Sequence, residues 1–301
     1  MKNIISILTS INLNYIDTLY VDEPENYLDD KIIKLLSTLF QIIINNNKKI
    51  VFVTHSARLL EIMKIKIDDI FMIPKLFNDF INITYQEVDA QIEKISNEIS
   101  NFTWTHQMKD VDKLQINMPN EFKKIFLDKL LKSQEFYRTL FYNEVVLMEG
   151  LTEKQILEES PQLITYSENA VFCGGKFSAP IYIAIYKLYK KRIVCFFDSD
   201  NNAVGKPCNC INEYILSLNE DYDNISYYFL EDCIESTLDI NTEQIIDAIM
   251  EKECSKNFRA DFIKKYKPYL SLFKIRKEPT CISKLNDVFQ IAHEYDDWLD
   301  S

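Results

Sequence analysis

The N-terminal part of the chain alternates between short apolar runs and a segment with the apolar spacing of a helix. An apolar run covers Asp17–Val21, Leu28–Ile44 carries apolar side chains every three or four positions, and a second apolar run covers Lys49–Thr54. This pattern predicts a strand, a helix and a strand. Strands that are apolar on both faces are typical of a parallel sheet covered by helices.

The pattern then becomes mainly helical. Ser56 is placed to cap a short helix through Lys64, and the apolar run Ile67–Ile73 predicts a further strand. From residue 87 to residue 143 the chain is polar, with apolar side chains at three-to-four spacing. We therefore expect a helical connector there.

A second alternating unit begins at Glu144. Its predicted strands and helices are, in chain order, strand Val145–Met148, helix Thr152–Glu159, strand Ala170–Cys173, helix Ala179–Tyr189, strand Arg192–Phe197 and strand Ile225–Phe229. From Asn241 onward strand signals are missing, so this part is predicted to be helical, with breaks at Pro268 and Pro279.

The predicted fold class is therefore α/β, divided into four parts. We expect a partial parallel sheet with helices over residues 1–86, the helical connector over 87–143, a second α/β domain with a parallel sheet over 144–240, and a helical C-terminal segment over 241–301. A chain of 301 residues with 47% hydrophobic residues can bury such cores, which excludes intrinsic disorder.

Composition narrows the possible functions. Lys and Arg (34) against Asp and Glu (46) give a net charge of −12, so contact with nucleic acid requires a local basic patch. The 7 cysteines form no C-x-x-C pair, which favours reduced thiols and a cytoplasmic location over a disulfide scaffold. No stretch approaches the roughly 18 apolar residues of a membrane span, so no membrane contact is predicted.

Polar residues follow both N-terminal strands. The first strand ends in Asp22 and Glu23, and the second ends in Thr-His-Ser with His55. An Asp that holds metal-bound water, a Glu that polarises the attacking water and a His near the γ-phosphate fit nucleotide hydrolysis. The segments Tyr-Val-Asp-Glu-Pro-Glu and Val-Phe-Val-Thr-His-Ser resemble the Walker B and switch-histidine segments of ABC-type ATPases, in the overcoming-lysogenization-defect and RecF-like branch.

The glycine-rich phosphate loop of that family is missing from this sequence. The chain has 4 glycines, and none of them fits G-x-x-x-x-G-K-[ST]. Because the backbone N–H groups of that loop cradle the triphosphate, we expect no ATP turnover by this chain alone. ATP is expected as a cofactor only if a partner chain supplies the loop.

Carboxylates also gather at strand ends of the second unit. Glu149 follows the first strand, and Gly150 permits a tight turn after it. The capping-box spacing of Thr152 and Gln155 predicts that a helix starts there, with Glu153 in its first turn. Glu153 is then either part of a site or simply a favourable anion at a helix N-terminus.

Asp198 and Asp200 follow the third strand of this unit. Alternate residues of an extended segment point the same way, so the two side chains are predicted to face together. Their repulsion is most simply relieved by a divalent metal ion. A calcium loop is excluded, because the sixth position counted from Asp198 is Ala203 instead of Gly, and the twelfth is Asn209 instead of Glu.

The order strand-Glu-Gly, strand-Gly-Gly, strand-Asp-x-Asp resembles the TOPRIM domain of topoisomerases, primases and overcoming-lysogenization-defect nucleases, in which an ABC-type ATPase precedes the TOPRIM unit. The resemblance covers about residues 1–240. It implies two ions, Mg²⁺ or Mn²⁺, and the matching ligands are Glu149, Asp198 and Asp200 for one ion and Glu153 and Glu235 for the other. Glu231 and Asp232 are rivals of Glu235.

The second strand of this unit ends in Gly174, Gly175 and Lys176. Flexible backbone with one cation predicts a contact to a substrate phosphate, although a simple turn explains these residues nearly as well. The pair Cys208 and Cys210 has no neighbouring ligand and does not indicate a metal site.

The C-terminal segment carries a basic stretch. Between residues 252 and 277 nine Lys or Arg stand against two acidic residues, which predicts a surface for a phosphate backbone or a solvated helix face. Phe258, Phe262 and Tyr266 recur every four residues, and we interpret them as part of a core. The resemblance also implies a catalytic lysine, for which Lys256 and Lys264 are candidates.

The resemblance, with the acidic residues that carry it, implies a magnesium- or manganese-dependent endonuclease that hydrolyses phosphodiester bonds by a two-metal mechanism. DNA is the favoured substrate and RNA stays open; the resemblance implies a role in anti-phage defence. The alternative is a non-catalytic or regulatory subunit that docks a P-loop-bearing ATPase chain. Association with a second copy of the chain also stays open.

Overall fold

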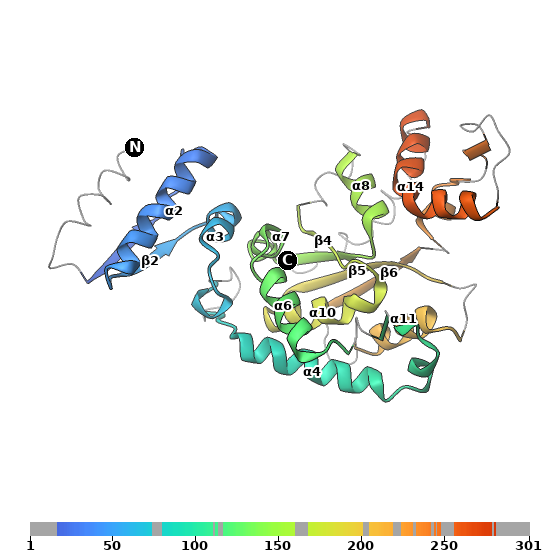
Figure 1. The fold of residues 1–301 in the computed structure, drawn as a ribbon, viewed down its shortest axis with the longest axis horizontal. Helices are drawn as coiled ribbons and strands as arrows, with labels where there is room; N and C mark the ends of the chain where they lie inside the picture. Colours follow the sequence, from blue (N-terminus) through green and yellow to red (C-terminus); the bar gives the residue numbers. More distant parts are fainter. Residues whose placement is uncertain are drawn as a thin grey trace, which may run out of the picture.

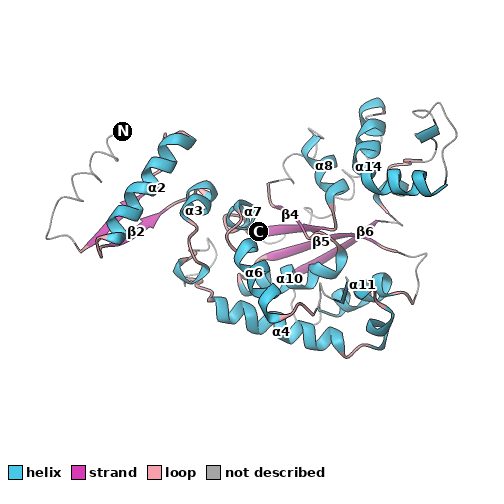
Figure 2. Ribbon diagram, viewed as in Figure 1, coloured by secondary structure: helices cyan, strands magenta, loops and turns pink. Residues whose placement is uncertain are grey.

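The computed structural model describes residues 17–73, 80–110, 112–113, 117–159, 168–200, 205–218, 224–230, 233–241, 244, 246–247, 256–278 and 280, without the side chains of 228–229, 256–261 and 264. The described chain is mixed α/β, as predicted, with a two-stranded sheet of order β1-β2 and a four-stranded sheet of order β4-β3-β5-β6 (Figures 1 and 2). Every strand pair in both sheets is parallel. None of the described helices has the length and apolar character needed to cross a bilayer.

The predicted strand, helix and strand at the N-terminus are confirmed as β1 (Thr18–Asp22), α2 (Asp30–Asn45) and β2 (Lys49–Val53). Asp29 caps α2, because its side chain accepts hydrogen bonds from the first backbone N–H groups of the helix. One side of α2, including Phe40, is buried against the two strands. The sequence pattern therefore places these elements correctly.

After β2 come α3 (Ala57–Met63), the 3₁₀ turn η1 (Ile67–Asp69), α4 (Tyr85–Ser100), the 3₁₀ turn η2 (Thr103–Gln107), α6 (Asn120–Leu130) and α7 (Gln134–Thr139). The described part of residues 87–143, the expected connector, is therefore mainly helical. The α3 helix is capped by Ser56, as expected. The hydroxyl of Tyr137 on α7 donates to the carbonyl of Ile65, which ties the connector to the end of α3.

The strand predicted over Ile67–Ile73 is wrong. This segment forms η1 and then a single antiparallel bridge between Met72 and Ile81. Its buried side chains, Ile67 and Ile70, are three residues apart, which is the spacing of a turn and not of a strand.

The second α/β unit contains the strands β3 (Glu144–Met148), β4 (Ala170–Phe172), β5 (Arg192–Asp198) and β6 (Ile225–Leu230). Its helices and turns are α8 (Leu151–Glu159), η3 (Lys176–Ser178), α10 (Ala179–Leu188), α11 (Pro207–Ser217) and α12 (Ile234–Thr237). All predicted strands and helices of this unit are therefore present, with no end shifted by more than one residue.

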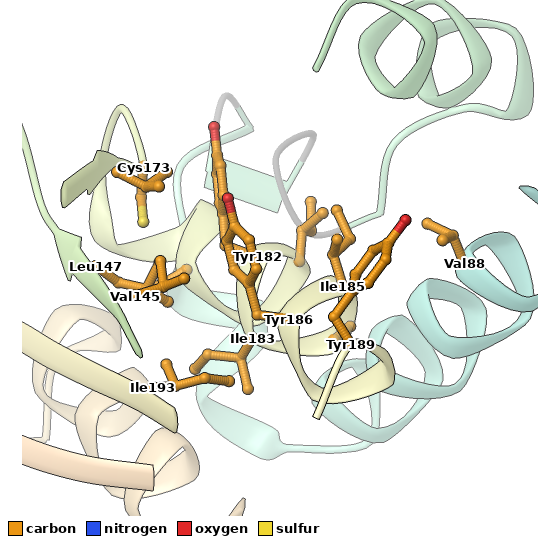
Figure 3. Close-up of a cluster of buried hydrophobic side chains, with 14 of the residues drawn as sticks. Val88, Val145, Leu147, Cys173, Tyr182, Ile183, Ile185, Tyr186, Tyr189 and Ile193 are labelled. Carbon is orange, nitrogen blue, oxygen red and sulfur yellow. The ribbon is translucent and has the colours of Figure 1, made fainter. Parts of the chain in front are cut away.

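Helices cover both faces of the four-stranded sheet. Val145 and Leu147 of β3 pack into a core with α10 and α4 (Figure 3), whereas Val146 and Met148 pack into a second core with α8 and α14 (Lys256–Lys277). Since successive strand residues point to opposite faces, one apolar strand serves both cores.

The C-terminal helix α14 runs through Pro268, so the helix break predicted there is wrong. Proline removes one backbone N–H donor from a helix. Pro268 is buried here, and its neighbours Leu270 and Leu272 belong to the core shared with α8, which offsets this loss. The break predicted at Pro279 lies outside the described residues.

Candidate active site

The acidic residues of the second unit lie at the carboxyl edge of its sheet. With the order β4-β3-β5-β6, the chain connections leave β3 and β5 in opposite directions, so a crevice is expected between the ends of these two strands. Glu149 directly follows β3, and Asp198 is the last residue of β5. Strand order alone thus brings these two carboxylates together.

Glu153 is positioned by the turn after β3. Its Oε2 accepts a hydrogen bond of 3.1 Å from the backbone N–H of Gly150, which ties the start of α8 to the turn. The capping box predicted for Thr152 and Gln155 is wrong, because α8 already begins at Leu151. Glu153 nevertheless accepts a hydrogen bond from the N–H group of the turn, as the glutamate of a capping box normally does.

Burial and mutual repulsion dominate the electrostatics of this edge. Burial, helped by the charges of Glu149 and Glu153, raises the pKa of Asp198 to about 8. Burial, helped by the charges of Glu149 and Glu235, raises the pKa of Glu153 to about 7. These carboxylates therefore lie close enough to act on one another, as the sequence predicted.

Lys176 neutralises part of this charge. Its buried ammonium group forms an ion pair with Asp200, lies 3.6 Å from Glu149 Oε2, and donates to the carbonyl of Asp198 at 2.6 Å. Asp200 adopts a left-handed backbone conformation with φ of 53°, because the strand has already ended at Asp198. The two aspartates thus share the edge through a turn, and not through the extended segment predicted.

A second lysine, Lys267 of α14, reaches the other side of the acidic edge. Its Nζ lies 2.9 Å from Oε2 of Glu235, the first-turn residue of α12. Burial is the largest influence on Lys267 and would lower its pKa, but the charge and hydrogen bond of Glu235, together with the charge of Asp198, raise the pKa overall. We define Glu149, Glu153, Asp198, Asp200 and Glu235, with these two lysines, as the acidic site.

Several oxygen atoms of the acidic site are buried and accept no hydrogen bond within the described part of the chain: Glu149 Oε2, Asp198 Oδ1 and Glu235 Oε1. Hard oxygen atoms left in this state fit Mg²⁺ or Mn²⁺ chemically. Among the described residues, however, no group of three or more His, Cys, Asp or Glu side chains is arranged to hold an ion. Lys176 stands between Glu149 and Asp200, so an ion there must displace its ammonium group.

The glycines before Lys176 have the backbone that the sequence indicated. Gly174 and Gly175 have φ of 70° and 124°, a region that favours glycine. The side chains of Lys256 and Lys264, and the rivals Glu231 and Asp232, lie outside the described residues.

The first predicted constellation also comes together. The parallel register of β1 and β2 sets Asp22 opposite Val53, and Nε2 of His55 lies 3.4 Å from Oε1 of Glu23. Glu25 accepts hydrogen bonds from the hydroxyl of Thr54 and, at 3.3 Å, from the backbone N–H of His55. The two strand ends are thereby fastened to each other. Asp22 is exposed.

Lys267 is the residue of the acidic site that sequence reasoning did not single out. It is one of nine basic residues in its segment and has no motif of its own. The available signal was its place in α14: Lys267 lies three residues before buried Leu270 and four before buried Ser271. A lysine on the buried side of a helix indicates an ion-paired partner.

Comparison with known proteins assigns no family or function to the site. No protein-family model matches the chain, and no curated protein matches it.

Proposed function

We propose that the chain is a divalent-metal-dependent endonuclease that hydrolyses phosphodiester bonds, with DNA as the favoured substrate. The observation that carries the proposal is the buried carboxylate of Asp198, which is coupled to three other carboxylates and keeps one oxygen without a hydrogen-bond partner among the described residues. A protein gains no stability from such an arrangement, so it points to a bound cation.

In this proposal the carboxylates of the acidic site and Lys267 have roles in binding metal ions or phosphate. Glu149, Asp198 and Asp200 would hold one ion, and Glu153 and Glu235 a second, both Mg²⁺ or Mn²⁺. Bound ions of this kind activate water and neutralise charge on a phosphate. Lys267 extends from α14 to this edge, where its ammonium group would attract and orient a phosphodiester.

The proposal is tested by metal addition and removal. We expect the purified chain to nick supercoiled plasmid DNA in Mn²⁺ or Mg²⁺, and EDTA to stop the reaction. Agarose gels that resolve supercoiled, nicked and linear forms measure the result. Intact plasmid at every metal concentration would contradict the proposal.

A second candidate function, docking of a P-loop-bearing ATPase chain, is favoured by one observation. Tyr20, Val51 and Val53 of β1 and β2 are exposed by about half or more, at 76%, 49% and 52%. Parallel sheets are normally covered on both faces. Co-purification with a P-loop-bearing polypeptide, together with absence of metal-dependent nicking, would favour this function over the first.

Lys176 offers a test of metal binding that does not depend on cleavage. Replacing Lys176 with Met removes a cation that competes for Glu149 and Asp200, so we expect Mn²⁺ to bind about tenfold more tightly. Isothermal titration calorimetry measures the affinity. The control is Lys191→Met, since Lys191 is also buried but donates to the carbonyls of Leu140 and Tyr142. Weaker binding in Lys176→Met would show that the ammonium group instead holds the acids in place.

A further inference from the structure

One face of α14 is exposed and carries an unusual set of side chains. Every exposed residue from position 265 to position 277 is aromatic or basic: Lys265, Tyr266, Tyr269, Phe273, Arg276 and Lys277. We call this set the aromatic–basic face. The opposite side of the helix, including Leu270, Leu272 and Ile275, is buried in the core shared with α8. The fold of α14 is therefore secured without the exposed aromatic rings.

The exposed rings form one stripe along the helix. Tyr266, Tyr269 and Phe273 follow the three-and-four spacing of a helix surface and are 36%, 56% and 39% exposed. The centroids of the Tyr266 and Tyr269 rings are 6.4 Å apart. Tyr266 also contacts Phe262, at 4.6 Å between centroids. Phe262 packs on the core, as predicted for the aromatic series, but Tyr266 does not belong to the core.

Basic groups lie directly against this stripe. Lys265 Nζ is 5.3 Å from the centroid of the Tyr266 ring, and Lys277 Nζ is 4.5 Å from that of Phe273. The chain as a whole has a net charge of −12, whereas the exposed residues from 265 to 277 include cations and no acid. The charge of the aromatic–basic face is complementary to a polyanion.

The chemistry selects one class of polyanion. Aromatic rings interleaved with Lys and Arg are the combination that binds single-stranded nucleic acid, because bases stack on the rings while phosphates meet the cations. Bases within a duplex are already stacked on each other and offer no free ring face.

The position of the face links it to the acidic site. Lys267 lies within the same stretch of α14 and reaches Glu235, and α14 lies beside α8 at one face of the four-stranded sheet (Figure 1). We propose that the aromatic–basic face binds an unpaired stretch of nucleic acid beside the acidic site, with bases stacked on Tyr266, Tyr269 and Phe273. This inference rests on the proposed nuclease function and specifies the form of its substrate.

Binding without cleavage tests the inference. In EDTA, the full chain is titrated against a fluorescein-labelled single-stranded DNA 30-mer of mixed sequence and against the matching duplex, with fluorescence anisotropy as readout. We expect the single strand to bind at least about tenfold more tightly than the duplex. Tyr269→Ala should weaken single-strand binding about tenfold, and Tyr269→Ala/Phe273→Ala further. The control is Phe122→Ala, an exposed ring on α6.

The outcomes separate this inference from the proposed function. Metal-dependent nicking by the wild type, combined with unchanged single-strand binding in Tyr269→Ala/Phe273→Ala, would overturn the inference alone. Equal binding of duplex and single strand would also overturn it. Loss of single-strand binding in the double variant, with no cleavage in any metal, would support the inference and overturn the nuclease. Circular dichroism confirms that each variant is folded.

Discussion

Replacing Asp198 with Asn is expected to abolish metal-dependent cleavage while it stabilises the metal-free protein. Three neighbouring carboxylates help to raise the pKa of Asp198. Its Oδ1 atom is buried and accepts no hydrogen bond among the described residues, so it is available to a cation. An amide of the same shape cannot neutralise a divalent ion, so we expect a loss of about 100-fold or more in the nicking rate.

The stability effect has a definite pH dependence. Because the pKa of Asp198 is raised to about 8, the folded protein binds a proton that the unfolded chain releases near pH 4, and stability is lost as pH rises between these values. The amide side chain of the variant does not titrate. In EDTA, the melting temperature of the variant should therefore exceed that of the wild type by an amount that grows from pH 5 to pH 8, to about 4–8 °C, and is constant at higher pH.

A surface aspartate provides the control for both measurements. Asp110 is 99% exposed, and Asp110→Asn should change neither the nicking rate nor the pH dependence of melting. Undiminished nicking in Asp198→Asn would remove Asp198 from the proposed machinery. A melting difference that is independent of pH would show that the acid is solvated in the folded protein.

Apolar runs predicted β3 and β5 of the four-stranded sheet well because both faces of these two strands are buried. In β3, for example, all five residues are buried, and the four after Glu144 form a continuous apolar run instead of an alternating pattern. Parallel strands also end at a common edge. That is why Glu149 and Asp198, 49 positions apart in the sequence, were predicted to meet.

Local signals failed where tertiary contacts decide the conformation. Ile67–Ile73 is apolar enough for a strand, but within the described part of the chain it meets one bridge partner, Ile81, and no sheet edge. Pro268 predicts a helix break from the backbone alone, yet burial against α8 holds the helix together. Neither contact can be derived from the neighbouring sequence.

The lysines of the acidic site illustrate the same limit. Lys176 was predicted to contact a phosphate, and in the structure its ammonium group contacts the carboxylates of Glu149 and Asp200. Lys267 follows Glu235 by 32 positions and meets it only because α14 packs across α8. The sequence spacing of long side chains on separate elements does not predict which groups they contact. Acids at the ends of parallel strands are different, because these ends meet at a common edge of the sheet. The assignment of Asp22, Glu23 and His55 to an ATPase-like site stays a prediction.

Replacing Lys267 with Met is expected to cost more stability than replacing its partner Glu235 with Gln. The carboxylate of Glu235 is 7% exposed, whereas the Lys267 side chain is 39% exposed. Loss of the lysine therefore leaves a buried charge without its cation, which we expect to cost about 2 kcal/mol at pH 7 after allowance for the solvent contact of the lysine. Loss of the glutamate leaves an ammonium group that water solvates.

The double variant Lys267→Met/Glu235→Gln separates charge pairing from packing. If the buried charge is the cause, urea denaturation should show that Glu235→Gln restores about 1–2 kcal/mol of the stability lost in Lys267→Met. Lys274→Met on the same helix is the control: it breaks a pair with Glu278, whose carboxylate is 59% exposed and stays solvated without the lysine, and should cost only about 0.3–0.5 kcal/mol. Additive losses in the double variant would show that the Lys267 stem, and not its charge, stabilises α14.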